Sequence, residues 1–113
     1  MPVPLYQAKA EFFRTLGHPA RIRVLEILSD GPAPVHELRA HIEIEASNLS
    51  QQLAVLRRSG LVIQQREAGE VIYSLAVPEV RDLLAAARHI LRAQTAERET
   101  LVDELSRTTG AAE

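Results

Sequence analysis

Apolar residues recur at steps of three and four along the first half of the chain, which is the spacing that buries one face of an α-helix. The pattern predicts four helices, at residues 5–16, 19–29, 35–42 and about 47–59. Gly17 and Pro19 separate the first two, because glycine is common just after a helix and proline is favoured in a first turn. Gly60 closes the fourth.

Two short segments rich in β-branched and aromatic residues follow, at residues 61–66 and 71–75. They flank a four-residue connection whose glycine is typical of a hairpin turn, and no other strand is expected. From Pro78 to about Arg107 the helical spacing returns. The sequence therefore predicts a mainly α fold with a β-hairpin and one long final helix.

The final helix is too long to be covered by its own domain. About 30 residues span ~45 Å at 1.5 Å per residue, more than the diameter of a compact domain of this size. Its distal apolar positions need a partner, and a second copy, packed also against the first helix, is the simplest. The predicted dimer interface contains Leu5, Tyr6, Phe12, Leu84, Ala87, Leu91 and Leu101. The alternative is a last helix that folds back or frays after about Ala96.

The third and fourth helices have the proportions of a helix-turn-helix, whose second helix enters the DNA major groove with its N-terminal residues on base edges. Asn and Gln can pair with adenine, serine can reach bases or phosphates, and arginine suits phosphates. The predicted DNA-binding residues are Ser47, Asn48, Ser50, Gln51, Gln52, Arg57, Arg58 and, in the hairpin, Arg66. The alternative is an ordinary solvated helix face, but the hairpin that follows makes the combination more specific.

Composition limits the remaining classes. With 113 residues the chain has the size of one domain, placed at residues 1–107 with a disordered tail at 108–113. The absence of cysteine excludes disulfides, thiolate metal sites and cysteine nucleophiles. No apolar run reaches the ~18 residues of a membrane span and no signal-peptide pattern is present, so a cytoplasmic protein without membrane partners is expected.

The net charge of −2 argues against DNA binding when it is read over the whole chain. Locally the sign is reversed, because residues 46–66 contain three arginines and no acidic residue. The charge is therefore unevenly distributed, and the predicted DNA-binding segment carries +3.

A resemblance to a known family rests on three stretches, LGHPARIRVLEIL, SNLSQQLAVLRRSGLV and REAGEVIYSL. Through them the chain resembles the ArsR (ArsR/SmtB) family of winged helix-turn-helix transcriptional regulators, over about residues 5–107. The resemblance implies a homodimer joined by the first and last helices. It also implies recognition helices in successive major grooves of an imperfect inverted repeat, a hairpin wing near the flanking minor groove, and repression by occluding a promoter.

The family's well-known sensing sites are not matched here. The cysteine-valine-cysteine element of the third helix corresponds to Pro34, Val35 and His36. The positions that match the two ligand pairs of the last helix are Val77, Glu79, Ile90 and Ala93, and a shift by one residue brings in His89 without recovering four ligands. We therefore assign no metal and no cofactor. A metal or small-molecule effector is not indicated, and a cysteine-based one is excluded.

The other histidines do not indicate a metal site either. His18 fits a capping or packing residue at the start of the second helix. His36 and His41 are five residues apart, about 140° around a helix, so they do not converge on one ion.

Two further features bear on function. Glu70 stands where many relatives place arginine, and a carboxylate faces phosphate unfavourably, so wing contacts are assigned to Arg66 and backbone groups. Tyr6, Phe12 and Phe13 are interpreted as interface core rather than the lining of an organic-ligand pocket.

The function expected from the sequence is that of a dimeric, sequence-specific DNA-binding repressor. The alternative is a winged-helix protein-interaction module with weak or no specific DNA binding, as Glu70 and the low net charge would suggest. An enzyme is a remote third hypothesis, because the sequence has no glycine-rich phosphate loop, nucleophile elbow or HExxH spacing.

Overall fold

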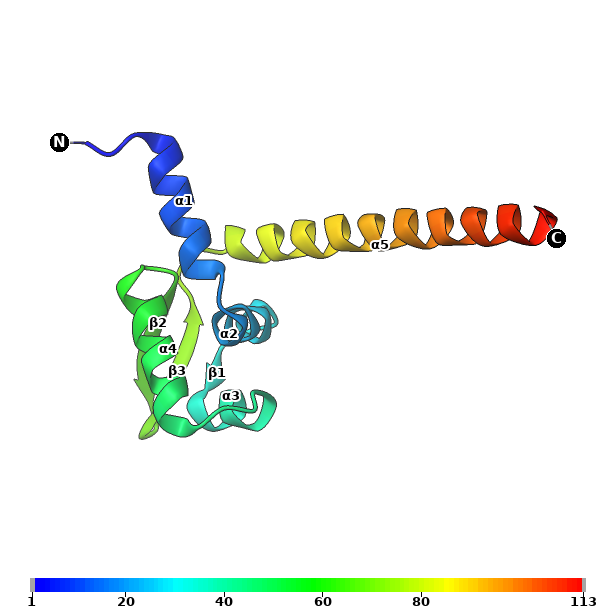
Figure 1. Ribbon diagram of the computed structural model, residues 1–113. Helices are drawn as coiled ribbons and strands as arrows, with labels where there is room; N and C mark the ends of the chain where they lie inside the picture. Colours follow the sequence, from blue (N-terminus) through cyan, green and yellow to red (C-terminus); the bar gives the residue numbers. More distant parts are fainter. Residues whose placement is uncertain (1, 113) are drawn as a thin grey trace. The chain divides into compact units, whose positions relative to one another are not determined.

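The computed structural model describes the backbone of residues 2–112 and the side chains of residues 2–107. Its elements are α1 (Leu5–Leu16), α2 (Pro19–Ser29), β1 (Ala33–Pro34), α3 (Val35–His41), α4 (Ala46–Arg58), β2 (Val62–Glu67), β3 (Glu70–Leu75) and α5 (Glu79–Ala112) (Figure 1). This order confirms the mainly α architecture with a hairpin before the last helix. The chain divides between Arg81 and Asp82 into two compact units, which are described separately.

A histidine-proline pair separates the first two helices. The Nδ1 atom of His18 accepts a hydrogen bond from the backbone N–H of Ala20 at 3.1 Å, which satisfies one of the N–H groups left unpaired at the start of α2. Pro19 follows as the first residue of α2, where a missing N–H does no harm. His18 is therefore a helix cap, one of the two roles expected for it.

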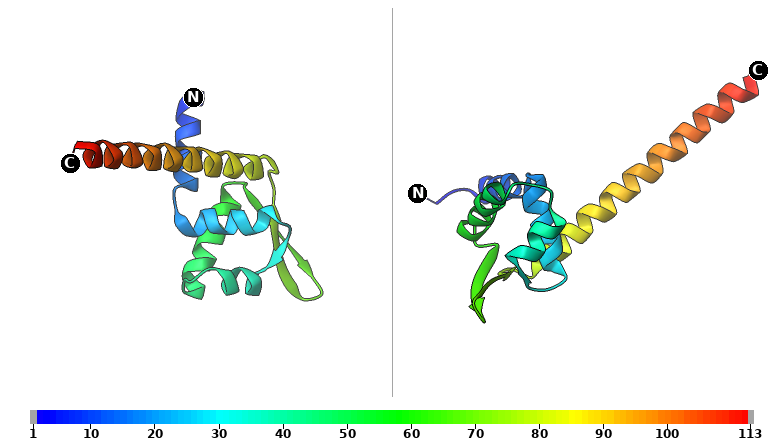
Figure 2. Two further views of the ribbon diagram at one scale, coloured as in Figure 1. Left: turned by 90° about the vertical axis from the view of Figure 1, so that its right-hand side faces the viewer. Right: turned by 90° about the horizontal axis from the view of Figure 1, so that it is seen from below.

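The core of the first unit lies between α2, α3, α4 and the sheet. Leu25, Leu38 and Leu56, one from each helix, have no exposed surface, and Val62 and Tyr73 contribute from the sheet. Contacts of α2 with α4 and β3, and of α4 with β2, group the helices beside the hairpin (Figure 2). Burying one such leucine contributes about 1.5–3 kcal/mol to the stability of the fold. The packing of these leucines therefore holds α4 in place against α2 and β2.

The sheet has three strands, in the order β1-β3-β2, and all pairings are antiparallel. Ala33 pairs with Tyr73, and Pro34 pairs with Ile72. The expectation that the hairpin would be the only β structure was therefore wrong. Two residues are too few to show the alternation of a strand, and β1 forms because the fold brings it beside β3.

A two-residue turn joins β2 and β3. Ala68 and Gly69 have φ angles of 51° and 83°, and two successive positive φ angles are the mark of a type I′ turn, whose twist matches that of the strands. Glycine adopts this conformation freely, whereas an alanine in the left-handed region is strained by roughly 1–2 kcal/mol. The hairpin with glycine at its turn is confirmed, with Ala68 as its strained residue.

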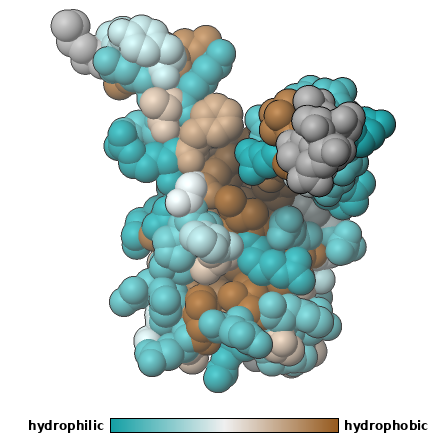
Figure 3. Space-filling view, turned by 45° about the vertical axis from the view of Figure 1, so that its right-hand side comes forward, coloured by the Kyte–Doolittle hydropathy of each residue, from teal (hydrophilic) through white to brown (hydrophobic). Residues whose placement is uncertain are grey.

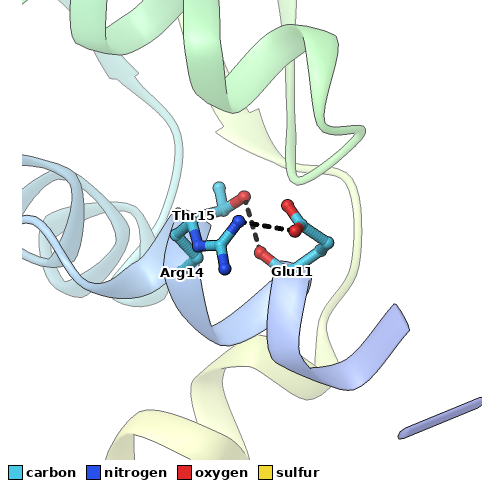
Figure 4. A network of polar contacts seen from close by, with 3 residues as sticks. All are labelled: Glu11, Arg14 and Thr15. Atoms are coloured by element: carbon cyan, nitrogen blue, oxygen red, sulfur yellow. Dashed lines mark hydrogen bonds and ion pairs between the residues drawn. The ribbon is translucent and has the colours of Figure 1, made fainter. Parts of the chain in front are cut away.

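Helix α1 is amphipathic. On its polar side, Arg14 Nη1 donates a hydrogen bond to Glu11 Oε1 at 2.6 Å, and Thr15 Oγ1 donates to the Glu11 carbonyl oxygen at 3.2 Å (Figure 4). On its apolar side, Leu5 is 70% exposed and Tyr6 is 71% exposed. Brown, apolar surface is visible on this helix toward the top of Figure 3. Helix α1 therefore presents apolar side chains to solvent.

The second unit is the single helix α5 from Asp82 onward. With 34 residues α5 is about 51 Å long, and it is continuous through Ala96, where the alternative prediction placed a break. Its backbone is helical to Ala112, beyond the end expected near Arg107. The tail predicted to be disordered is thus helical in backbone over residues 108–112, whose side chains, like Glu113 as a whole, lie outside the described residues. Within the described residues, no helix has the length and apolar character needed to span a membrane.

Candidate nucleic-acid interface

Helices α3 and α4 form a helix-turn-helix joined by residues 42–45. Glu45 is extended, and its carbonyl oxygen accepts the N–H of Leu49 at 2.9 Å, which starts the hydrogen-bond ladder of α4. The inner side of α4 is anchored by leucines such as Leu49 and Leu56, which are 1% and 0% exposed. The opposite side is left to solvent.

Five of the predicted DNA-binding residues share the solvent side of α4, and we call them the reading surface. They are Ser47, Ser50, Gln51, Arg57 and Arg58, and all five are exposed. At about 100° per residue they cover roughly a third of the helix circumference, with both serines and the glutamine in the N-terminal half and both arginines in the last turn. Their placement agrees with the expected face, and their contact with DNA stays a prediction.

Gln52 does not belong to this surface. Its side chain is only 8% exposed, and both ends of its amide are used inside the protein. Its Oε1 accepts a hydrogen bond from Arg21 Nε at 2.8 Å, and its Nε2 donates to Asn48 Oδ1 at 2.9 Å. The placement of Gln52 among the solvent-facing residues was wrong, because its position is rotated about 100° from Gln51 toward the buried leucines. Asn48 is half-buried.

Arg21 is a residue that sequence reasoning missed. It lies within the buried stripe of α2, between Ala20 and Val24, and is itself half-buried. In addition to its bond to Gln52, its Nη1 donates to the carbonyl oxygen of Thr15 at 3.2 Å. A signal was present in the sequence, because a charged residue on the apolar side of an amphipathic helix requires a polar partner.

The arginines of the interface are available to an external anion. Arg57, Arg58 and Arg66 are exposed, and among residues 2–107 no ion pair joins any of them to a carboxylate. Arg57 and Arg58 also occupy the last turn of α4, where a positive charge interacts favourably with the helix dipole. The local charge of +3 is therefore not neutralised by pairing within the described chain.

Glu70, at the start of β3 in the wing, lies beside a histidine of the helix-turn-helix. Glu70 Oε1 lies 3.3 Å from Nε2 of His36 on α3, and both side chains are more than half exposed. This contact joins the hairpin to the helix-turn-helix and could not be read from positions 34 residues apart in the chain. In the part of the chain that the structure describes, no three His, Asp or Glu side chains gather as metal ligands.

The residues predicted for a dimer interface differ in how exposed they are. Leu5, Tyr6, Ala87, Leu91 and Leu101 are exposed, whereas Phe12 and Leu84 are half-buried. The Phe12 ring packs edge-on against Phe13, with ring centroids 5.5 Å apart. Helices α1 and α5 each present apolar surface of the kind that marks association sites, and its coverage by a second copy stays a prediction.

Comparison with protein families and curated proteins gives matches over most of the chain. The family model described as "Bacterial regulatory protein, arsR family" matches residues 18–64. The uncharacterized HTH-type transcriptional regulator Rv0081 of Mycobacterium tuberculosis is 48% identical over 103 residues, 90% of each chain. The biofilm growth-associated repressor of Agrobacterium fabrum is 38% identical over 90 residues, 76% of this chain and 77% of its own.

Solved structures match as well. The crystal structure of M. tuberculosis Rv0081 has a TM-score of 0.78 at 50% identity and covers 86% of this chain and 98% of its own. A homodimeric winged helix-turn-helix DNA-binding domain, Mb0332 from Mycobacterium bovis, has a TM-score of 0.72 at 22% identity over 82% of this chain and 86% of its own. The first structure agrees in sequence and fold, and the second in fold alone.

Proposed function

Because the chain belongs to the arsR family of bacterial regulatory proteins, we propose that it is a homodimeric, sequence-specific DNA-binding repressor that occludes a promoter. The observation that carries the proposal is the reading surface, an exposed face of α4 with serine and glutamine side chains at one end and arginines at the other. The Agrobacterium relative is named a repressor, which supports this direction of regulation.

The N-terminal half of α4 is assigned to base recognition. In a helix-turn-helix the first residues of the second helix reach the base edges of the major groove. Gln51 is exposed there and can pair with adenine, while Ser47 and Ser50 can reach a base or a phosphate. A good bidentate pair discriminates against a wrong base by about 1–3 kcal/mol, so Gln51 is expected to contribute most of the specificity of this face.

The arginines are assigned to the phosphate backbone. Three exposed arginines per protomer, Arg57, Arg58 and Arg66, give six phosphate contacts in a dimer. Each contact contributes about −0.9 to the slope of log affinity against log salt concentration, so a slope of roughly −5 is expected. In the wing, the Glu70 carboxylate, whose Oε1 lies 3.3 Å from His36 Nε2, is not assigned to phosphate.

The apolar sides of α1 and α5 are assigned to the dimer. Leu91 and Leu101 on α5 are 62% and 55% exposed, and Leu5 on α1 is 70% exposed. Two copies related by a two-fold axis would cover these side chains and present two reading surfaces to the two halves of an inverted repeat. Because the chain contains no cysteine, the proposal includes no thiol-based sensing.

Selection of bound fragments from genomic DNA tests the proposal directly. The expected result is enrichment of an imperfect inverted repeat, protected over both halves in a footprint and bound with the salt slope given above. A protein that stays folded and dimeric but enriches no sequence would contradict the proposal. That outcome would favour the alternative of a protein-interaction module.

The dimer is tested by Leu91→Glu, which places a charge in the apolar stripe of α5. The matched control is Ala96→Glu, which adds the same charge about 140° around the helix, on the polar side. Sedimentation should give monomers for the first variant and dimers for the second. Dimers in both variants would contradict the assignment of Leu91 to the interface.

A further inference from the structure

The strongest unexplained feature of the first unit is a series of partly buried polar contacts between helices. It runs from the Thr15 carbonyl oxygen in the last turn of α1, through Arg21 on α2, to Gln52 and Asn48 on α4. Within the described residues, no buried side-chain nitrogen or oxygen lacks a partner. The series of contacts ends in the first turn of the proposed recognition helix.

The chemistry of arginine fixes the direction of the hydrogen bonds in this series. A guanidinium group has donors and no acceptor, so the atom of Gln52 that faces Arg21 Nε at 2.8 Å is the carbonyl oxygen Oε1. The NH₂ group of Gln52 is then the end that faces Asn48, and it donates to Asn48 Oδ1 at 2.9 Å. Each amide orientation follows from the one before it.

The amide of Asn48, the last in this series, therefore has a defined orientation. Asn48 Oδ1 is held by Gln52, while no hydrogen bond within residues 2–107 uses Asn48 Nδ2. Asn48 is the third residue of α4 and is half-buried, so it belongs to the N-terminal residues that would approach base edges in a helix-turn-helix. The group that it can offer to DNA is thus an NH₂ donor.

We propose that Arg21 and Gln52 are positioning residues that set Asn48 as a hydrogen-bond donor to one base of each half-site. The proposal rests on the DNA-binding function proposed above and deepens it. A donor favours an edge made of acceptors, so Asn48 is expected to favour guanine (N7 and O6) or thymine (O4) over adenine, whose N7 acceptor stands beside an amino donor. The sequence alone suggested a bidentate pair with adenine instead.

The Gln52→Glu variant reverses the polarity with almost no change of shape. A carboxylate only accepts, so it keeps the bond from Arg21 and takes a second one from Asn48 Nδ2. Asn48 then turns Oδ1 outward and becomes an acceptor. At the base read by Asn48, the preference should move to cytosine or adenine, which present an amino group there.

The experiment is selection from random DNA with the wild type, Gln52→Glu, Asn48→Ala and Arg21→Lys, after thermal melting has shown that each variant is folded. Asn48→Ala should remove the preference at one position per half-site by about 5-fold or more. Gln52→Glu should change the preferred base at that same position. Arg21→Lys should keep the wild-type base, because lysine is also a pure donor.

Each outcome decides the proposal. An unchanged base at that position in Gln52→Glu, or an unchanged profile in Asn48→Ala, overturns it while the wild type still selects DNA. A lower affinity spread evenly over all positions is the effect of added negative charge or lost stability, and it also overturns the polarity assignment. A wild type that selects no DNA overturns the proposed function itself, and the donor role of Asn48 with it.

Discussion

Replacing Arg58 by glutamine removes one positive charge from the reading surface of each protomer, and the magnitude of the effect follows from the exposed arginines. With six phosphate contacts the dimer is expected to lose roughly 2,000-fold in affinity between 50 and 200 mM salt. With four contacts the salt slope falls to about −3.6, and the same change of salt costs only about 150-fold. Taking the two proteins to bind equally at 1 M salt, these slopes make the variant roughly 30-fold weaker than the wild type at 150 mM salt.

Fluorescence anisotropy with the selected operator, measured from 50 to 300 mM KCl, gives both slopes. The matched control is Arg23→Gln, which removes the same charge from the exposed side of α2, where Arg23 pairs with Glu26. The control should keep the wild-type slope. Equal slopes for wild type and Arg58→Gln would refute the assignment of Arg58 to phosphate, and equal reductions in both variants would show that only net charge matters.

Three further variants test the reading surface, the wing and the core. Gln51→Ala should cost roughly 1–3 kcal/mol of discrimination at one base pair without changing the salt slope, in competition with single-base operator variants, and an equal loss on all sequences would argue against a base contact. Ala68→Asn should raise the free energy of unfolding in urea by up to about 1 kcal/mol, because asparagine tolerates the left-handed conformation better than alanine, and a decrease would show that the turn is not strained there. Leu25→Ala should lower the free energy of unfolding by roughly 2–5 kcal/mol, since Leu25 has no exposed surface, and a loss below 1 kcal/mol would contradict its place in the core.

The helical part of the fold could be predicted because local signals and burial agree. Gly17 and Pro19 set the boundary between α1 and α2, and the leucines of α4 repeat at the spacing that its buried side requires. The hairpin was also predictable, because Gly69 supplies a positive φ between two β-rich segments. In each of these cases the information lies within a few residues of the element.

The remaining features depend on residues far apart in the chain. Gln52 sits at the edge of the buried face of α4, and only the arginine on α2 decides that its amide turns inward. Glu70 lies beside His36 on α3, a contact that no local sequence pattern indicates. Spacing along one helix can place a residue on a face, but the choice of partner is made by how the helices pack.

The short strand β1 has a consequence for how copies of this protein meet. It lies along β3 at one edge of the sheet, and Pro34 has no backbone N–H to offer to a further strand. The opposite edge, β2, is exposed over residues 63–67 and carries both arginine and glutamate. Neither edge is a good template for adding a strand from another molecule. At high protein concentration the sheet is therefore protected from the edge-to-edge association to which exposed sheet edges are prone.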